Sequence, residues 1–451
     1  MSERGAAAPA ERRPLPRRLA RAARRVLGGE AGRLALLMAA AAVIRCALLL
    51  TPGYDVRDYR LWASVVARTG VGGAYGAAYP APAPWYNYPP AYLYVLRGVG
   101  LLYQSLCPGG AWQDHLLTAL VKLAPILAEL ALGGLLYWVA RRHRGARVAC
   151  WTAAAYLLNP GLIWDTAYWG GIDALHALAL TGALVAAGAR RPTLSWPLAT
   201  LAIGTKLLAA PGALATLPGP LRARRWPRLA LAAGAALAAG LLLALPVLLR
   251  GRFPLMVRLM FSNLGNSALI SANAHNLWWL VTGGGGWRPD TLRVLPGLSY
   301  RDAGLALFAL GAAWTLRQLW RSPNDLADVC LAGAFLTLAF CFLTTEVHEN
   351  WGYALFAPLA LGAALRPRYR PLYALLSLTF LANLALHDPA LRRFAGPGFD
   401  RPALLLSLAN AALNLLAFAW WAALLAREPA RRAALDRESR PVAAPGSLLR
   451  H

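Results

Sequence analysis

The sequence predicts an all-α fold, a polytopic bundle of transmembrane helices, and three observations lead to that class. Hydrophobic residues make up 58% of the 451 residues and charged residues 15%, whereas soluble globular chains carry about 25% charged residues. The mean hydropathy is +0.43. The apolar residues fall into repeated runs bounded by Arg, Pro or Gly, and about 20 apolar residues span a bilayer as a helix. These runs predict about 12 membrane segments, including one broken helix pair.

The charge balance is strongly basic, with 46 Lys and Arg residues against 20 Asp and Glu residues, a formal net charge of +26. Most basic residues lie in short loops and in the two tails, the arrangement of membrane proteins whose basic loops face the cytosol. We therefore expect membrane lipids as partners, and no nucleic acid. The five cysteines form no CxxC motif, so neither a disulfide framework nor a zinc site is expected.

The transmembrane domain is expected to cover residues 31–425, between a basic arm over 1–30 and a basic tail over 426–451. The arm has no short apolar region followed by a cleavage site, so it is not a signal peptide. We expect it to be disordered in the cytosol, where it either touches anionic lipid or acts only as a topology signal. The tail is predicted to be cytosolic as well.

The first span, about residues 31–52, should run from the cytosol to the exterior, which places the polar, Pro-rich and aromatic stretch 53–112 on the exoplasmic side. Within that loop, residues 91–106 are apolar but short, and Arg97 lies in their middle. If this stretch crossed the membrane, the basic loop 141–147 would face outward, against the usual distribution of charge. We therefore expect an amphipathic helix that lies in the membrane interface.

The later spans follow the remaining apolar runs. They are about 113–139, 147–163, 171–189, 228–249, 302–320, 326–345, 351–365, 370–386 and 402–425. The stretch 195–220 has basic residues on both sides and contains Lys206 and two prolines. We expect two short half-helices that meet near Lys206 and turn back, because broken helices are tolerated where they line a cavity within the protein. A second exoplasmic loop, 250–301, holds a GGGG turn at 283–286.

In this topology, nearly all acidic residues and histidines close to an apolar run fall on the exoplasmic side. They are Asp55, Asp58, Asp165, Asp173, His275, Glu346, His348, Glu349, His387 and Asp388. An ionisable side chain at membrane depth costs about 2.5–3.5 kcal/mol on insertion scales. Several such side chains on one side predict a polar cavity there.

Five stretches carry the residues that could perform chemistry. They read GYDVRDYRLWA (53–63), WYNYPPAYLYVL (85–96), LNPGLIWDTAYWGGIDALHALAL (158–180), AIGTKLLAAPG (202–212) and TTEVHENWGYALFAPLAL (344–361). In this order, and with the Lys-x-x-Pro-Ile-Leu-Ala-acid run from Lys122 to Glu129, they resemble the GT-C superfamily of membrane glycosyltransferases. The nearest pattern is that of the dolichyl-phosphate-glucose-dependent glucosyltransferases and their bacterial relatives. The chain departs from it at Glu129, where Asp is usual, and at Asn350, where a basic residue is usual.

The resemblance implies a polyprenyl-phosphate sugar as donor, and it implies roles for individual residues. Displacement at the anomeric carbon needs a base for the acceptor hydroxyl and cations for the departing phosphate. Asp55 matches the family's base, although it could instead anchor its loop to Arg57 or Arg60. His348 matches an active-site histidine that contacts donor phosphate or sugar, with a helix-capping role as the alternative.

The expected substrate-binding residues come from four segments. They are Asp58, Tyr88, Asp173, Lys206 and Glu349. Lys206 is expected to bind the donor phosphate, unless it is a snorkelling lysine, and Asp58 could be structural. Arginines of the second loop could add a phosphate clamp; the candidates are Arg258, Arg288, Arg293 and Arg301.

Lys122 and Glu129 lie seven residues apart on one helical face, which favours a buried pair that holds helices together. His275 is expected at the interface, near an aromatic belt. The first loop holds Asp-x-x-Asp with an Arg between, and no second acidic pair has the spacing of oxygen ligands. No cofactor and no divalent metal are therefore expected.

The sequence thus predicts an integral membrane hexosyltransferase, a mannosyltransferase or glucosyltransferase of the cell envelope. It would pass the sugar to a lipid-linked glycan, glycolipid or cell-surface polymer, on the exoplasmic face of a bacterial plasma membrane. Three alternatives stay open: a transporter or lipid flippase, a lipid-modifying acyltransferase, and a chain of this fold without activity.

Overall fold

Helices make up most of the chain that the computed structural model describes, which is residues 29–53, 55–79, 86–111, 114–262 and 268–438. Paired strands in these residues are confined to a hairpin of β1 (Arg293–Leu295) and β2 (Leu298–Ser299). The prediction of an all-α polytopic bundle is confirmed. The predicted arm lies outside the described residues except for its last two positions.

Each predicted span contains a helix. The first half of the chain holds α2 (Glu30–Cys46), α3 (Val56–Thr69), α4 (Val71–Ala74), α5 (Pro90–Leu106), α6 (His115–Leu157), α7 (Pro160–Ile163), the π-helix η1 (Trp164–Trp169), α8 (Asp173–Gly188), α9 (Pro192–Thr205), η2 (Leu207–Ala209), α10 (Ala210–Ala213), η3 (Leu214–Thr216) and α11 (Pro218–Ala223). The second half holds α12 (Trp226–Leu249), α13 (Phe253–Ser262), α14 (Leu277–Val281), α15 (Tyr300–Arg321), α16 (Leu326–Leu343), η4 (Trp351–Leu355), α17 (Phe356–Leu365), η5 (Pro367–Tyr369), α18 (Arg370–His387), α19 (Pro389–Ala395), η6 (Pro397–Phe399) and α20 (Asp400–Glu438).

By length and hydropathy, four described helices can cross a membrane, namely α6, α12, α16 and α20. The bent pair of η5–α18 and α19, with an angle of 68° between its parts, is a candidate for a fifth span. Shorter apolar helices, α8 and η4–α17, add to the bundle. Only 17% of the apolar window of α12 is buried inside the protein, which fits a helix that faces lipid.

The predicted break between two helices within 140–146 is present but shorter than expected, because the two helices that make up α6 meet at Gly145. The helical ladder runs on both sides of Gly145, which alone departs from helical geometry with φ 77° and ψ 172°. Glycine adopts this left-handed φ without a steric penalty. The expected loop is therefore a sharp kink between two helical halves.

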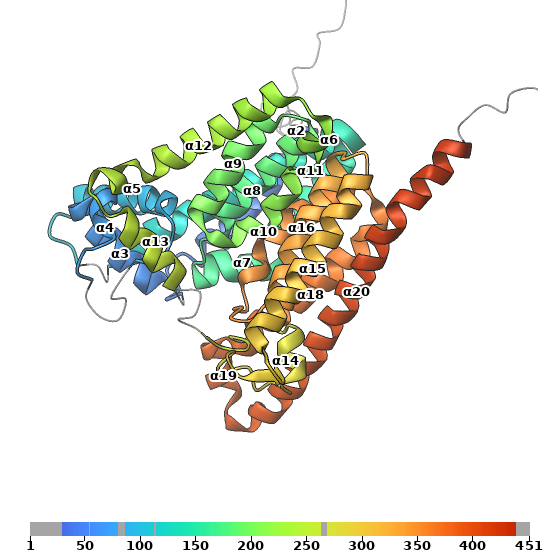
Figure 1. The fold of residues 1–451 in the computed structure, drawn as a ribbon. Coiled ribbons are helices and arrows are strands. Elements are labelled where there is room, and N and C mark those ends of the chain that lie inside the picture. The colour runs from blue at the N-terminus through green and yellow to red at the C-terminus, as the bar shows by residue number, and fades with distance from the viewer. Residues whose placement is uncertain (1–28, 54, 80–85, 112–113, 263–267, 439–451) are drawn as a thin grey trace, which may run out of the picture.

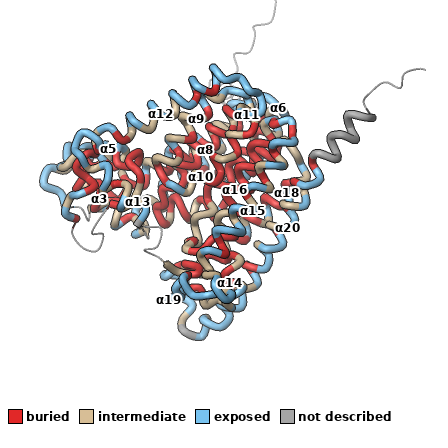
Figure 2. Tube along the Cα trace, in the orientation of Figure 1, coloured by how far each residue is buried: buried red, intermediate tan, exposed pale blue. Residues whose placement is uncertain are grey.

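Two parts are visible in Figure 1: α3, α4, α5 and α13 form a lobe, and α12 connects this lobe with the main bundle. The larger buried cluster lies in the main bundle and draws on α6, α8, α16, α17 and α18. A second, aromatic-rich cluster fills the lobe. Figure 2 shows buried residues concentrated along α8, α10 and α16, while much of α12 and α20 is exposed.

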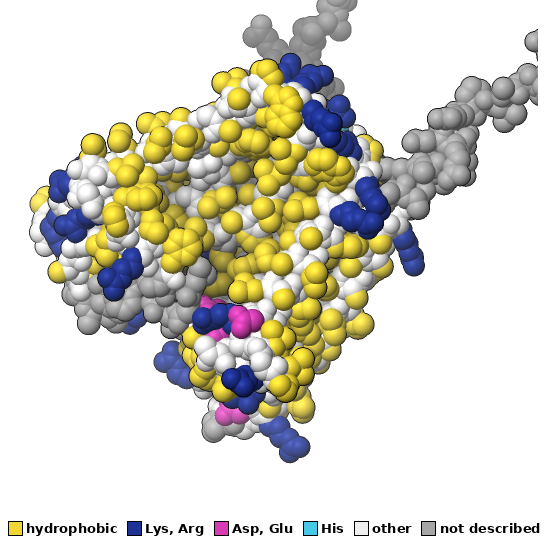
Figure 3. Space-filling model, in the orientation of Figure 1, with side chains coloured by type: hydrophobic (Ala, Val, Ile, Leu, Met, Phe, Trp, Pro, Cys, Tyr) yellow, Lys and Arg dark blue, Asp and Glu magenta, His cyan; other side chains and the backbone are white. Residues whose placement is uncertain are grey.

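The basic loops gather at one end of the bundle. Arg141 pairs with Glu30 at 2.9 Å, and Arg222 donates to the carbonyl oxygen of Trp320 at 2.7 Å. At the same end, Arg366 pairs with Asp328 at 2.6 Å and with Glu428 at 3.1 Å. In Figure 3, apolar side chains cover much of the visible face, while Lys and Arg side chains gather at its upper right and also lie on the left lobe and, beside Asp and Glu side chains, in its lower part.

The prediction of a broken helix at Lys206 is confirmed. Helix α9 ends at Thr205, and Lys206 is extended, with φ −151° and ψ 128°. The chain then returns through η2, α10, η3 and α11, because Trp196 Nε1, near the start of α9, donates to the carbonyl oxygen of Thr216 at 3.5 Å. The two half-helices therefore begin and end at the same end of the bundle.

Candidate functional site

The start of α3 places Asp55 at the edge of the aromatic lobe. Its Oδ2 accepts a hydrogen bond from the Tyr59 hydroxyl at 3.3 Å, and the Tyr59 and Tyr88 hydroxyl oxygens lie 3.4 Å apart. Burial raises the pKa of Asp55, Lys206 opposes this shift, and the negative charge of Asp173 adds to it. A carboxylate with a raised pKa is a stronger base than an ordinary aspartate, as a general base requires.

The broken helix brings Lys206 to the same place. Lys206 Nζ forms an ion pair with Asp173 Oδ1 at 2.7 Å, and it lies 5.8 Å from the centre of the Tyr88 ring. Lys206 is 7% exposed and Asp173 is fully buried. The snorkelling alternative for Lys206 is therefore wrong, because its ammonium faces the interior of the protein.

A second carboxylate, Asp165, faces the same cluster from the π-helix η1. Asn350 Nδ2 donates to Asp165 Oδ1 at 3.1 Å and lies 3.5 Å from Asp173 Oδ2. Asp165 is fully buried, and its Oδ2 has no hydrogen-bond partner among the described residues. Asn350 thus bridges the turn after α16 and the turn before α8, a role that no sequence pattern indicated.

The turn after α16 carries His348 and Glu349. The backbone of this turn pairs with the segment 272–273, where the Ala272 amide donates to the Val347 carbonyl at 3.0 Å. Burial and the positive charge of Lys206 lower the pKa of His348 to about 4. Burial raises the pKa of Glu349 to about 7, its own backbone N–H opposes this shift, and Asp55 adds to it.

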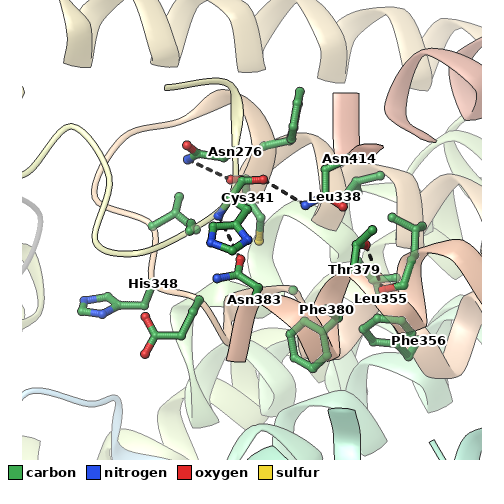
Figure 4. A pocket seen from close by; sticks show the side chains of 17 residues that line it. Asn276, Leu338, Cys341, His348, Leu355, Phe356, Thr379, Phe380, Asn383 and Asn414 are labelled. Atoms are coloured by element: carbon green, nitrogen blue, oxygen red, sulfur yellow. Dashed lines mark hydrogen bonds between the residues drawn. The ribbon is translucent and has the colours of Figure 1, made fainter. Parts of the chain in front are cut away.

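Both side chains border a small cavity with a volume of about 60 Å³. Figure 4 shows His348 at one edge of this cavity, pointing away from the aromatic rings of Phe356 and Phe380. Three asparagines, Asn276, Asn383 and Asn414, supply the polar part of its lining. The cavity therefore has an aromatic and aliphatic floor and a polar mouth beside the Lys206 cluster.

Replacing Glu349 by Gln is expected to change how stability depends on pH. With a folded pKa of about 7 against 4.5 ordinarily, the native state keeps a proton at Glu349 that the unfolded chain releases in this interval. Its contribution to stability is therefore present below pH 4.5 and is lost as the pH rises to 7. Thermal unfolding at pH 5 and pH 8 should show that Glu349→Gln gains in Tm relative to the parent as the pH rises. An equal Tm difference at both pH values would contradict the assignment.

Asp58 lies apart from this cluster. Its Oδ1 accepts from Arg57 Nε at 3.4 Å, and its side chain is 33% exposed. Of the expected loop arginines, Arg301 is held by Asp290 at 2.9 Å and by Glu346 at 3.0 Å. Asp58 and Arg301 are therefore partly exposed, and each is held by ion pairs outside the Lys206 cluster.

The expected Lys122–Glu129 pair is wrong, although both side chains are fully buried. Glu129 accepts from Arg45 at 2.6 and 2.8 Å. Lys122 instead donates to oxygens of the segment after α2 and of η1. His275, expected at the interface, is buried, with its Nε2 3.0 Å from His387 Nε2.

Among the described side chains, no three His, Cys, Asp or Glu residues are placed to hold one metal ion together. The expectation of a metal-free reaction remains a prediction. The described cluster instead contains one cation, Lys206, among the carboxylates of Asp55, Asp165 and Asp173. The ammonium of Lys206 is therefore the group in this cluster that could bind a phosphate group.

No protein-family model matches the chain, and no curated protein matches it. Two solved structures are similar to it, the crystal structures of ArnT from Cupriavidus metallidurans bound to undecaprenyl phosphate and in the apo state. Each is 19% identical, with a TM-score of 0.47, over 89% of this chain and 78% of that chain.

Proposed function

We propose that this protein is an integral membrane glycosyltransferase of the GT-C type, which moves a hexose from a polyprenyl-phosphate donor to a lipid-linked glycan, glycolipid or cell-surface polymer. The observation that carries the proposal is the meeting of Asp55 and Lys206. They come from segments 151 positions apart in the sequence and are joined through Tyr59 and Tyr88. A base and a cation in one cluster are what displacement of a sugar phosphate needs.

The reaction follows from these positions. The acceptor hydroxyl oxygen attacks the anomeric carbon while Asp55 takes the hydroxyl proton. The bond between that carbon and the phosphate oxygen breaks, and its electron pair leaves with the phosphate. Lys206 stabilises the negative charge of the leaving phosphate, and attack from the opposite face inverts the anomeric configuration.

The remaining cluster residues bind the substrates in this proposal. His348 and Glu349 border the cavity and contact the donor sugar or phosphate, while Asp173 holds Lys206 until the donor arrives. Tyr88, beside Lys206, lines the donor site. No divalent metal takes part in this proposal. The donor carries a single phosphate group, and the ammonium of Lys206 can offset its negative charge without a metal ion.

The active site lies on the exoplasmic face of a plasma membrane in this proposal, with both termini in the cytosol. The supporting observation is that Arg-rich loops pair with Glu30, near the start of the described chain, and with Glu428, in the last described helix. The prenyl chain of the donor enters from the outer leaflet, and α5 borders its entrance as an interfacial helix.

A transfer assay tests the proposal. The purified protein in lipid nanodiscs is incubated with radiolabelled polyprenyl-phosphate mannose, glucose or arabinose, with a membrane lipid extract as acceptor and with EDTA in half of the samples. We expect transfer from one hexose donor, release of the polyprenyl phosphate, and equal rates with and without EDTA. Turnover of none of the donors would count against the activity, and transfer of arabinose alone would count against a hexose. A loss of transfer in EDTA would overturn the metal-free reaction.

A further inference from the structure

A buried ammonium sits where two parts of the site meet. Lys122, two turns into α6, is fully buried. Five oxygen atoms surround its Nζ, and they come from two segments far apart in the sequence. They are the carbonyl oxygens of Leu48 (3.3 Å), Thr51 (2.8 Å), Ala167 (2.9 Å) and Tyr168 (3.0 Å) and the hydroxyl oxygen of Thr51 (2.7 Å).

The electrostatic reason for a cation here is the convergence of carbonyl oxygens from two segments. Leu48 and Thr51 lie in the turns that follow α2, and Ala167 and Tyr168 lie at the end of η1. Carbonyl groups at the C-terminal end of a helix lack intrahelical donors and carry partial negative charge. Carbonyl oxygens at contact distance repel one another, and the ammonium of Lys122 between the two segments offsets this repulsion.

The contact between these two segments is close even without Lys122. Thr51 Oγ1 also lies 2.9 Å from the Tyr168 carbonyl oxygen, and a Cβ at Gly53 would collide with the Trp169 carbonyl oxygen. Gly170 packs against the Lys122 side chain itself, because a Cβ there would lie 3.0 Å from Lys122 Cε. The two segments are therefore fitted around the lysine.

These segments lead directly to the site. Thr51 is four residues before Asp55, and η1 carries Asp165 and continues through two glycines to Asp173. We infer that Lys122 is a positioning residue for the proposed glycosyl transfer, whose ammonium fixes the segment of Asp55 against the turn that leads to Asp173 and Lys206. This inference rests on the proposed function.

Lys122→Met keeps the length of the side chain and removes its charge. Because misplacement of reacting groups by about 1 Å can cost about 100-fold in rate, we expect kcat to fall about 10- to 100-fold. The KM for the donor should stay within about threefold of the parent value, because the groups that touch the donor remain. Steady-state transfer, normalised to the folded fraction from size exclusion and thermal unfolding, measures both constants.

Asp328→Asn is the control at a buried ion pair elsewhere in the bundle. It weakens the pair with Arg366 at 2.6 Å, so it should lower Tm, but Asp328 contacts neither segment that leads to the site, and kcat should stay at the parent value. Thr51→Val leaves the ammonium in place and removes only its hydroxyl partner. We expect for it an intermediate fall in kcat, and this variant decides the question if Lys122→Met does not fold.

Other outcomes would overturn the inference. If Lys122→Met and Asp328→Asn lost turnover equally after normalisation, or if Lys122→Met or Thr51→Val kept the parent kcat, the lysine would be a structural residue only. A rise in donor KM at constant kcat would also exclude a positioning role. Absence of transfer by the unsubstituted protein is a separate result, which would overturn the proposed function and this inference with it.

Discussion

Asp55→Asn is expected to abolish glycosyl transfer, lowering kcat by about 10²- to 10⁴-fold, the range for loss of a general base. The amide has nearly the same shape and can keep the contact with the Tyr59 hydroxyl, but it cannot take the proton of the acceptor. The donor should still bind, because Lys206 and the cavity are unchanged. Transfer and donor binding, measured separately in nanodiscs, distinguish the two effects.

A surface aspartate provides the matched control for this variant. Asp400 pairs with Arg392 at 2.8 Å, and its side chain is 72% exposed, so Asp400→Asn should transfer at the parent rate. The parent rate should also fall on the acid side at a higher pH than for an ordinary aspartate, because burial raises the pKa of Asp55. Full transfer by Asp55→Asn would remove Asp55 from the reaction and shift the role of base to His348 and Glu349.

Lys206→Met is expected to weaken donor binding at least tenfold and to lower kcat/KM about 100-fold or more, since it removes the cation that meets the phosphate. It should also destabilise the protein, because it leaves Asp173 as an uncompensated buried charge, for which losses of about 3–5 kcal/mol are typical. Donor affinity and Tm are the two measurements. A single variant cannot separate the loss of the phosphate-binding cation from the loss of the partner of Asp173.

A double-mutant cycle with Asp173→Asn separates the two causes. In the Asp173→Asn background, the carboxylate that pairs directly with the ammonium is gone, so Lys206→Met should cost less stability than it does in the parent. Its effect on donor binding should persist, because the phosphate remains. If the donor bound equally well to Asp173→Asn with and without Lys206, the lysine would serve only to neutralise Asp173.

The broken helix and the site cluster could be predicted because their signals lie along the chain. A lysine and two prolines interrupt an otherwise apolar stretch at 195–220, and an ammonium cannot face lipid without a large cost. The alternation of successive spans across the membrane also predicts that Asp55, Asp173 and His348 lie on the same side. The structure adds the contacts of Asn350 and Tyr59. In the sequence, Asn350 stood out only as a departure from the family pattern, and Tyr59 only as a residue one helical turn after Asp55.

The partners of Lys122 and Glu129 could not be predicted, and the physical reason is general. Their spacing places both side chains on one helical face, but a face does not reveal what packs against it. Arg45, from α2, takes Glu129, while the carbonyl oxygens that take Lys122 belong to the backbone and leave no mark in the sequence. The break at Gly145 was predicted as a loop over 140–146, and the sequence did not indicate how short the connection is.

The return of the chain between Pro192 and Ala223 determines on which side of the membrane every later loop lies. Since Trp196 meets Thr216, this segment adds no net crossing, and reporter domains inserted beside Arg190 and Arg224 should lie in the same compartment. A hydropathy plot that counts the segment as one span would invert every later loop. It would place the turn of His348 across the membrane from Asp55, and the two halves of the site would be assigned to different compartments.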